Sequence, residues 1–274
     1  MMSLLQISWN ADPEIFRLGG LAVRWYGLFW AMSFYLGYEI VYRMFKKEGI
    51  PHGHTDKLLI YLASGTILGA RLGHCFFYDF NYYWSNPLEI LYIWQGGLAS
   101  HGGAIGILIS VYLFQKRVSN RSVWGLVDRL VIPISLGAFF IRMGNLMNSE
   151  IYGIQTSLPW GFIFEARNEV VAKHPTQLYE GIPYLMLFFW LGWLYMKKRE
   201  VLPEGRISAY FAISMFLVRF LVEFIKEDQS AFEAGMLLNM GQWLSLPLLI
   251  FGFVKLYRTF GQKPVVYPRN PAVK

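Results

Sequence analysis

The sequence predicts an all-α membrane protein with about seven transmembrane helices, its N-terminus outside and its C-terminus cytoplasmic. Three observations predict this class. Hydrophobic residues make up 55% of the 274-residue chain and charged residues only 16%, whereas soluble domains carry about 25% charged residues. Apolar runs recur at about the 20-residue length that a helix needs to cross a bilayer. Basic residues concentrate in alternate loops, as in multi-pass membrane proteins.

Seven apolar runs are the predicted spans. They cover residues 21–42, 57–77, 98–115, 124–142, 178–196, 207–225 and 237–257. Residues 1–20 lack the basic start, apolar run and cleavage site of a signal peptide, so we expect the first span to stay in the protein. We expect residues 1–274 to form one integral-membrane domain.

The basic loops set the predicted orientation. Lys and Arg cluster within residues 43–57, 116–121, 197–206 and 255–274, which follow spans one, three, five and seven. Because such clusters favour the cytoplasm, the N-terminus is predicted to face outward. The opposite side carries only Arg17, Arg167, Lys173 and Lys226. Two small outer segments are then expected, an aromatic interfacial arm over 78–97 and a loop or cap over 148–177. Within the second, residues 158–164 are typical of a short strand or turn.

Five arginines fall within the predicted spans: Arg24, Arg71, Arg129, Arg142 and Arg219. A charged side chain near the bilayer centre costs about 2.5–3.5 kcal/mol even on lenient scales, which makes such residues functional candidates. The predicted orientation gathers all of them except Arg129 in the outer half of the membrane. Arg129 adjoins Asp128 near the cytoplasmic start of span four, so an interface anchor or a structural ion pair is expected there.

Composition excludes several other classes of function. Cys75 is the single cysteine, so an intramolecular disulfide is impossible and a small buried hydrophobe is the expected role. The histidines lack the His-Glu-x-x-His spacing of zinc helices, and we expect neither metal nor cofactor. The net charge of +7 suits anionic lipid. That charge is spread through short loops, which argues against nucleic-acid binding.

Small residues and polar pairs indicate how the helices meet. Glycines 65, 69 and 73 in span two and 102 and 106 in span three are expected to pack helix backbones closely. Arg142 shares a helix face with Asn145, and Arg219 shares one with Glu223. A guanidinium fork matches phosphate oxygens, so the arginines form a predicted phospholipid-headgroup clamp. For Arg219 and Glu223 alone, simple mutual neutralisation is the alternative. His101 lies among glycines and is a possible general base.

These motifs, in this order and at these spacings, resemble the prolipoprotein diacylglyceryl transferase family over nearly the whole chain. The family signature Gly-Arg-x-Gly/Ala-Asn-Phe-x-Asn-x-Glu-x-x-Gly is matched over residues 141–153. Ile141 and Leu146 depart from its first Gly and its Phe, which bears on local packing rather than on activity. Met215 stands where some members have a tyrosine. Supporting matches are Arg-Trp-Tyr26-Gly, Gly-Ala-Arg71-Leu-Gly, Ser-His101-Gly-Gly, His174-Pro-Thr-Gln-Leu-Tyr-Glu180 and Arg219-Phe-Leu-Val-Glu223-Phe.

The resemblance implies a transferase of the bacterial inner membrane with its active site toward the outer leaflet. Its implied partners are phosphatidylglycerol, a preprolipoprotein signal peptide with a lipobox cysteine, and membrane lipid, with no cofactor. The diacylglyceryl group moves to the cysteine thiol, a thioether forms and glycerol phosphate leaves. The carried-over catalytic residues are His101, Arg142, Arg219 and Glu223; the substrate-binding ones are Tyr26, Arg71, Asn145, Asn148, Glu150 and Gly153.

The expected roles of these residues follow from their chemistry together with the family resemblance. Arg142 and Arg219 are expected to hold the phosphate, with Arg24 and Arg71 in support. His101 or Glu223 takes the thiol proton, because the thiolate is the nucleophile. Asn145 and Asn148 orient oxygens of the headgroup, Tyr26 shapes its site, and Glu150 orients an arginine. The alternative is a phospholipid or anion transporter, a class that usually carries internal repeats; none is evident in the sequence.

Overall fold

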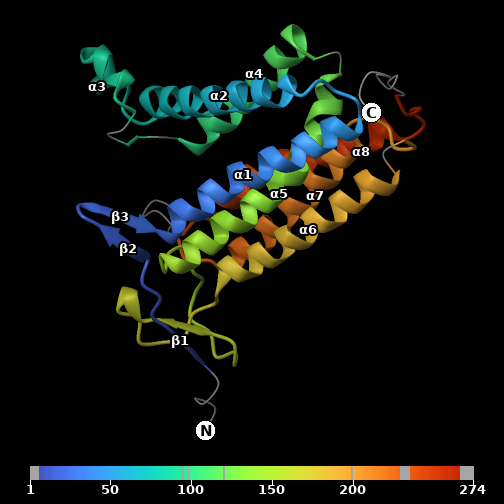
Figure 1. Cartoon of the computed structure of the whole chain (residues 1–274). Coiled ribbons are helices and arrows are strands. Elements are labelled where there is room, and N and C mark those ends of the chain that lie inside the picture. The colour runs from blue at the N-terminus through green and yellow to red at the C-terminus, as the bar shows by residue number, and fades with distance from the viewer. Residues whose placement is uncertain are drawn as a thin grey trace. The chain divides into compact units, whose positions relative to one another are not determined.

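The computed structural model describes residues 6–93, 96–97, 99–119, 121–198, 200–228 and 235–265, and Figure 1 labels its elements. The chain divides into two compact units. Unit 1 comprises Met1–Ile40 and Asp128–Val266, and unit 2 comprises Val41–Val127 and Tyr267–Lys274. Helices α1 (Trp25–Lys47) and α5 (Val123–Met147) each contribute to both units. The two units are described separately below.

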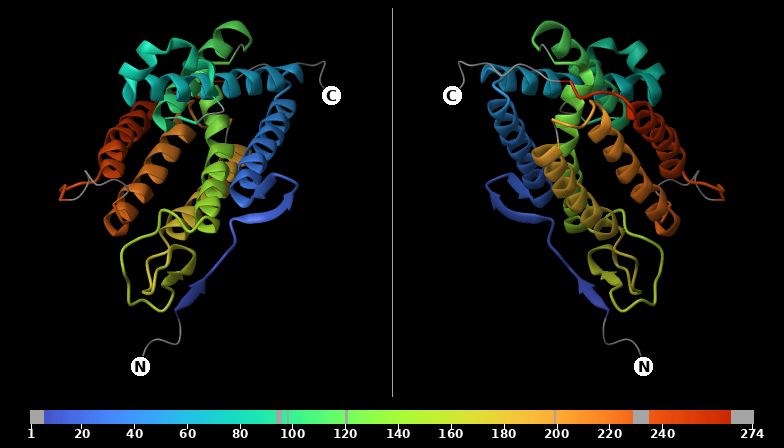
Figure 2. Two further views of the ribbon diagram at one scale, coloured as in Figure 1. Left: turned by 90° about the vertical axis from the view of Figure 1, so that its left-hand side faces the viewer. Right: turned by 90° about the vertical axis from the view of Figure 1, so that its right-hand side faces the viewer.

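Unit 1 is a helical bundle that carries small sheets. Besides its parts of α1 and α5 it holds α6 (Thr176–Lys198), α7 (Arg206–Val222) with the 3₁₀ helix η4 (Glu223–Ile225), and α8 (Met240–Thr259). Helix α7 contacts both α6 and α8, and Figure 2 shows these helices from two sides. The rings of Phe29 and Phe140 stack 5.9 Å apart and join α1 to α5. Leu191 and Ala209 are completely buried between the helices.

The strands of unit 1 correct the all-α prediction in part. Strand β1 (Ile7–Trp9) pairs in parallel with β4 (Phe162–Phe164), and β2 (Glu14–Leu18) pairs antiparallel with β3 (Leu21–Arg24). The short strand expected within 158–164 is therefore confirmed at 162–164. The first predicted span was placed too early, because helix α1 begins only at Trp25.

Arg24 does not lie within a helix. It ends strand β3, its side chain is 63% exposed, and its Nη2 lies 3.5 Å from Glu14 Oε1 in the paired strand. The expectation that Arg24 lies within the first membrane-spanning helix was wrong, because it ends a strand. The hairpin satisfies its charge, so no membrane site is needed to explain it.

Unit 2 is built on the close pairing of α2 (Gly53–Phe77) and α4 (Ser100–Arg117), with the short α3 (Phe80–Ser85) and the 3₁₀ helix η1 (Pro87–Leu91) between them. The glycine stripes pack as predicted. A Cβ added to Gly73 would lie 2.8 Å from Gly102 Cα, and one on Gly69 would lie 2.9 Å from Gly106 Cα. Cys75 is buried, as expected. Trp94 of the predicted arm lies outside the described residues.

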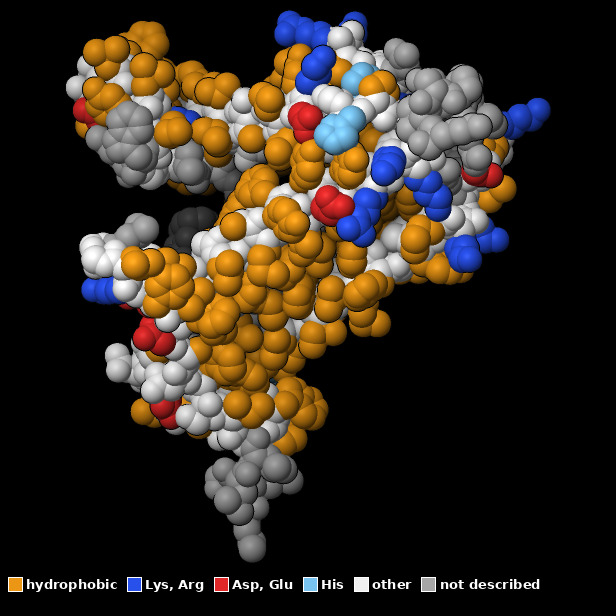
Figure 3. Space-filling view, in the orientation of Figure 1, with side chains coloured by type: hydrophobic (Ala, Val, Ile, Leu, Met, Phe, Trp, Pro, Cys, Tyr) orange, Lys and Arg blue, Asp and Glu red, His pale blue; other side chains and the backbone are white. Residues whose placement is uncertain are grey.

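Four helices of the described part of the chain are long and apolar enough to cross a membrane: Gly53–Phe77, Val123–Met147, Arg206–Ile225 and Met240–Thr259. Helix α6 covers the predicted span 178–196, and helices α1 and α4 overlap most of the spans 21–42 and 98–115. Figure 3 shows a broad apolar surface over the helices of unit 1. Helix α6 exposes Ile182, Met186, Phe189 and Trp193, which recur at helical spacing. A continuous apolar exterior of this kind is typical of a lipid-facing protein.

Asp128 ties α5 to the start of α7. Its carboxylate is 6% exposed and accepts hydrogen bonds from Gly205 N (2.6 Å), Ser208 N (2.8 Å) and Ser208 Oγ (2.5 Å). The first N–H groups of a helix have no partner within it, so Asp128 acts as a cap supplied by a neighbouring helix. Arg129 lies 5.9 Å over the ring of Tyr195. These contacts agree with the structural role expected for the two residues.

We expect Asp128→Ala to destabilise the protein. Each buried donor left without a partner costs about 1–3 kcal/mol, and each kcal/mol shifts the Tm of a chain of this size by about 2–4 °C. The Tm in detergent should therefore fall by about 5 °C or more, and less for Asp128→Asn, which keeps an acceptor. Asp56→Ala, on a half-exposed side chain, is the control. An unchanged Tm for Asp128→Ala would contradict the capping role.

Candidate active site

Five charged side chains of unit 1 form a continuous series of contacts, here called the ion chain. Arg142 Nη2, on α5, lies 2.5 Å from Glu180 Oε2 on α6. Lys226 Nζ, just after η4, lies 2.6 Å from Glu180 Oε1 and 2.7 Å from Glu223 Oε1. Arg219 Nη2, on α7, lies 3.7 Å from Glu223 Oε1. Positive and negative groups alternate from one arginine to the other.

The two ends of the ion chain differ in burial. Glu180 is completely buried, and Glu223, Lys226 and Arg142 are each less than one-tenth exposed. The Arg219 side chain is 35% exposed. Buried charges persist in proteins when they are paired and hydrogen-bonded. The ion chain is therefore a preorganised charged interior that ends in one accessible guanidinium.

Residues at the start of α8 and α6 shape the space around the ion chain. Asn239 caps α8 in a capping box with Gln242 and donates from Nδ2 to Glu223 Oε2 at 3.1 Å. A Cβ on Gly241 would lie 2.9 Å from Glu223 Cγ and overlap the carboxylate. A Cβ on Gly181 would lie 3.4 Å from Arg142 Cβ. Small residues are thus placed where the charged side chains pass between helices.

The signature motif extends the ion chain through amides. Arg142 Nη1 donates to Asn145 Oδ1 at 3.1 Å, and Asn145 Nδ2 donates to Glu150 Oε1 at 2.8 Å. Asn148 Nδ2 donates to the same Glu150 oxygen at 3.3 Å. The structure therefore brings together four predicted site residues. Glu150 was expected to orient an arginine, and it reaches Arg142 through Asn145 rather than directly.

The backbone around Glu150 is in an uncommon conformation. Ser149 and Ile151 have φ of 51° and 60°, a left-handed region that is uncommon for residues other than glycine and rarest for β-branched ones such as Ile151. Helix α6 holds this turn in place, because Gln177 Nε2 donates to Glu150 O and Thr176 Oγ1 donates to Ile151 O, both at 2.8 Å. Strained backbone that is held by its surroundings often occurs at functional sites.

Gly153 and Tyr26 are packing positions in this structure. Gly153 is buried, pairs as an isolated antiparallel bridge with Lys226, and has no room for a Cβ between Ile225 O and His174 Cβ. It is enclosed by its neighbours here, and its substrate-binding role stays a prediction. Tyr26 lies against α5: a Cβ on Gly144 would be 2.5 Å from its ring.

Arg71, in unit 2, holds the segment 78–97 rather than an open site. It is 2% exposed and donates to four carbonyl oxygens: Glu89 O at 2.5 Å, Ile90 O at 2.9 Å, Gly96 O at 2.6 Å and Gly97 O at 3.3 Å. Its guanidinium also lies 5.0 Å from the centre of the Tyr83 ring. Most of its N–H groups are occupied by backbone, which gives Arg71 a structural role, and its predicted contact with substrate stays a prediction.

His101 lies at the start of α4 in unit 2 and is exposed. Its ring stacks on Tyr78 at 5.7 Å and meets Phe77 edge-on at 6.1 Å. His101 and the ion chain belong to different units, so a joint site stays a prediction.

A second charged network fixes the segment 148–177, which we call the cap segment. Lys173 Nζ lies 2.5 Å from Glu227 Oε1, and the hydrogen bond between them raises the Lys173 pKa. The Tyr152 hydroxyl donates to Glu169 at 2.8 Å. Burial, followed by that bond, raises the Tyr152 pKa to about 12. The cap segment is thus tied to the residue that follows Lys226.

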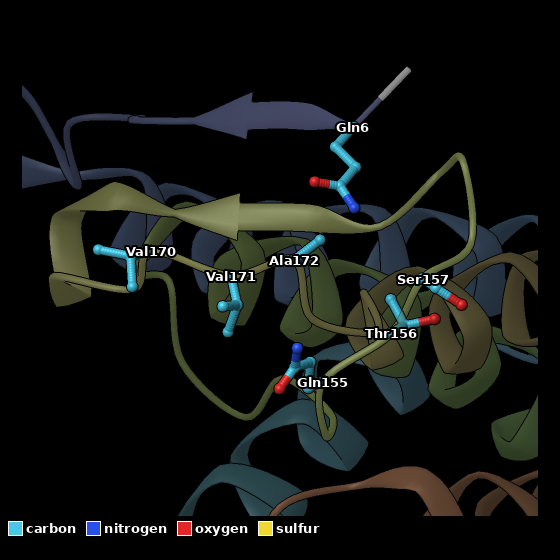
Figure 4. Close-up of a pocket in the computed structure, with 7 residues that line it drawn as sticks. All are labelled: Gln6, Gln155, Thr156, Ser157, Val170, Val171 and Ala172. Carbon is cyan, nitrogen blue, oxygen red and sulfur yellow. The ribbon is translucent and has the colours of Figure 1, made fainter. Parts of the chain in front are cut away.

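The cap segment also contains a cavity of about 540 Å³. Figure 4 shows side chains around it from both sides of the cap segment's loop and from the residue before β1. The lining residues are Gln6, Gln155, Thr156, Ser157, Val170, Val171 and Ala172. None of them is charged and none is a predicted site residue. The cavity offers no group for acid–base chemistry and is separate from the candidate site.

Sequence reasoning missed Glu180, Lys226 and Asn239 as members of the site. Glu180 ends a motif that was recognised only as a family match, and Lys226 was counted only as a basic loop residue. A usable signal was available, because a buried arginine needs a counter-charge. Glu180, next to a predicted helix start, was a strong candidate for that partner.

Comparison with known proteins agrees with these motifs. The family model for prolipoprotein diacylglyceryl transferase matches residues 13–258. The phosphatidylglycerol–prolipoprotein diacylglyceryl transferase of Tolumonas auensis is 44% identical, covering 93% of this chain and 98% of the relative. Its counterparts in Chloroherpeton thalassium and Bacteroides fragilis are 42% and 39% identical, covering 93% and 96% of this chain and 95% and 98% of the relatives. The resemblance drawn from the sequence is confirmed, and the chain belongs to the prolipoprotein diacylglyceryl transferase family.

Proposed function

We propose that this chain transfers the diacylglyceryl group of phosphatidylglycerol to the thiol of the lipobox cysteine of a preprolipoprotein. A thioether forms and glycerol phosphate leaves. The observation that carries this proposal is the ion chain, a buried series of charges that ends in the accessible guanidinium of Arg219. Family membership makes the protein a transferase, so the transporter alternative has no support.

Phosphate binding is assigned to the two arginines. Arg219 meets the headgroup first, because its side chain is accessible and its ion pair with Glu223 is long. Arg142 contributes the N–H groups that Glu180 and Asn145 do not use. Negative charge grows on the phosphate oxygen as the carbon–oxygen bond of the diacylglyceryl group breaks. Cations fixed in advance in a low-dielectric site stabilise that charge without further reorganisation.

His101 is assigned as the base that removes the proton from the cysteine thiol. Glu223 is the other candidate, but its carboxylate already accepts from Lys226 and Asn239. His101 carries an exposed imidazole at the start of α4, and imidazole suits proton transfer near neutral pH. Asn145 and Asn148, oriented by Glu150, direct the glycerol and phosphate oxygens, and Tyr26 shapes the headgroup site.

The membrane arrangement is part of the proposal. Helices α1, α2, α4, α5, α6, α7 and α8 cross the bacterial inner membrane, with the N-terminus outside and the C-terminus in the cytoplasm. The cap segment and the arm over 78–97 then lie outside, and the site opens toward the outer leaflet. The unequal distribution of Lys and Arg among the loops supports this orientation.

The proposal is tested with purified protein, phosphatidylglycerol and a lipobox peptide. We expect release of glycerol phosphate and a peptide whose mass increases by one diacylglyceryl group. A peptide with serine in place of the cysteine, and vesicles that contain phosphatidylethanolamine alone, are the controls. Folded protein that releases no glycerol phosphate would rule the proposed reaction out.

A further inference from the structure

We infer that Lys226 is a positioning residue that sets the spacing of Arg142 and Arg219 and couples both arginines to the cap segment. The inference rests on the proposed function, in which these arginines hold the phosphate. Lys226 itself is 6% exposed and touches no substrate in that function. It acts through the two carboxylates on either side of it.

The first step is the bond pattern of the lysine. Its ammonium donates to Glu180 Oε1 at 2.6 Å and to Glu223 Oε1 at 2.7 Å. Glu180 is the carboxylate that holds Arg142, and Glu223 is the one paired with Arg219. Without the ammonium, two buried carboxylates would face each other across the space that it fills. Like charges in one buried site repel or take up a proton, and either change would displace the arginines.

The second step is the backbone of Lys226, which is paired with the cap segment. Gly153 forms an antiparallel bridge with Lys226. On either side of it, Ile154 N donates to Ile225 O at 2.9 Å and Glu227 N donates to Tyr152 O at 3.3 Å. Any movement of residues 152–154 therefore moves the lysine. This pairing explains why the signature motif ends in a glycine, since a Cβ there would push Ile225 and Lys226 away.

The third step is that both carboxylates keep other partners when the lysine is removed. The Tyr184 hydroxyl donates to Glu180 Oε2 at 3.0 Å, and Asn239 Nδ2 donates to Glu223 Oε2. The helices should then stay packed while the charges shift. Lys226 contacts the carboxylates of Glu180 and Glu223. Those carboxylates in turn contact Arg142, Tyr184 and Arg219, and Glu227 is the next residue in the chain. Loss of the lysine should therefore make the rate of transfer more strongly dependent on pH.

The experiment compares Lys226→Met and Lys226→Arg with wild type in the transfer assay, from mildly acidic to alkaline pH. A misplacement of about 1 Å costs about 100-fold in rate, so we expect kcat/KM for phosphatidylglycerol to fall by about that factor in Lys226→Met. The loss should be greatest at alkaline pH, where both carboxylates are ionised and repel each other across the space that the ammonium filled. Lys226→Arg keeps the charge and should recover most of the activity. Lys255→Met, at the opposite end of the α7 and α8 pair, is the control and should behave as wild type.

Four results separate the possibilities. Wild-type kcat/KM and pH profile in Lys226→Met would overturn the inference. Equal losses in Lys226→Met and Lys226→Arg, with a lowered Tm and no change in pH profile, would also overturn it, because they indicate a role in packing alone. If Lys226→Met does not fold, Gly153→Ala displaces the same backbone without removing the charge, and unchanged activity there would overturn the coupling to the cap segment. Absence of transfer by wild type would instead refute the proposed function.

Discussion

Arg219→Ala is expected to lower transfer by about 100-fold or more, because one preorganised donor to a developing oxyanion is worth about 10²–10³ in kcat. The same variant should be nearly as stable as wild type. The Arg219 side chain is 35% exposed and its ion pair with Glu223 spans 3.7 Å, and such pairs contribute about 0–1 kcal/mol. Glu223 keeps Lys226 and Asn239 as partners, so no buried charge is left alone.

The measurement is glycerol phosphate release as phosphatidylglycerol is varied, together with the Tm in the same detergent. Arg219→Lys keeps the charge but loses the planar fork that matches phosphate, so intermediate activity is expected. Arg206→Ala is the matched control, at the far end of α7 where the guanidinium donates to Thr259. Transfer by Arg219→Ala at the wild-type rate would remove Arg219 from the phosphate site.

Local patterns predicted most of the helices, and the errors occurred where a short apolar run had two possible structures. Residues 21–24 continue the hydrophobic run of α1, and a run of this length does not distinguish strand from helix. The hairpin prevails because Gly19, with φ of 59°, permits a tight turn and Glu14 pairs with Arg24 across the two strands. The glycine stripes of α2 and α4 were predictable because small residues have a single strong reason to recur in apolar helices.

Contacts of the site between residues close in sequence were predicted, whereas contacts between residues far apart in sequence were missed. The contact of Arg142 with Asn145 follows from helical spacing, as does that of Arg219 with Glu223. The contact of Lys226 with Glu180 joins residues 46 positions apart, and no periodicity indicates it. The burial of Arg71 was likewise predictable, but its partners are carbonyl oxygens of a loop whose path depends on the tertiary fold. An intramembrane arginine therefore predicts a functional or structural partner without distinguishing the two.

Arg142→Met is expected to remove both activity and stability, in contrast to Arg219→Ala. Arg142 is 9% exposed, and its guanidinium is 2.5 Å from the completely buried carboxylate of Glu180. Removing one partner of a buried ion pair costs about 3–5 kcal/mol when the other charge is left uncompensated. Because Glu180 keeps Lys226 and Tyr184 as partners, the loss should lie toward the lower end of that range. Asn145 also loses the donor to its side-chain oxygen, which frees the amide that connects Arg142 to Glu150.

The double variant Arg142→Met with Glu180→Gln separates the two effects. The single oxygen of a neutral glutamine can accept from Lys226 while its amide group donates to the Tyr184 hydroxyl, so part of the Tm lost in the single variant should return. Transfer should stay absent, because the guanidinium is still missing from the phosphate site. A single variant with wild-type Tm would contradict the buried pair, and a double variant that regains transfer would contradict the phosphate role of Arg142. Recovered stability without recovered activity would show that Arg142 serves both the fold and the chemistry. Arg219, by contrast, is expected to serve the chemistry alone.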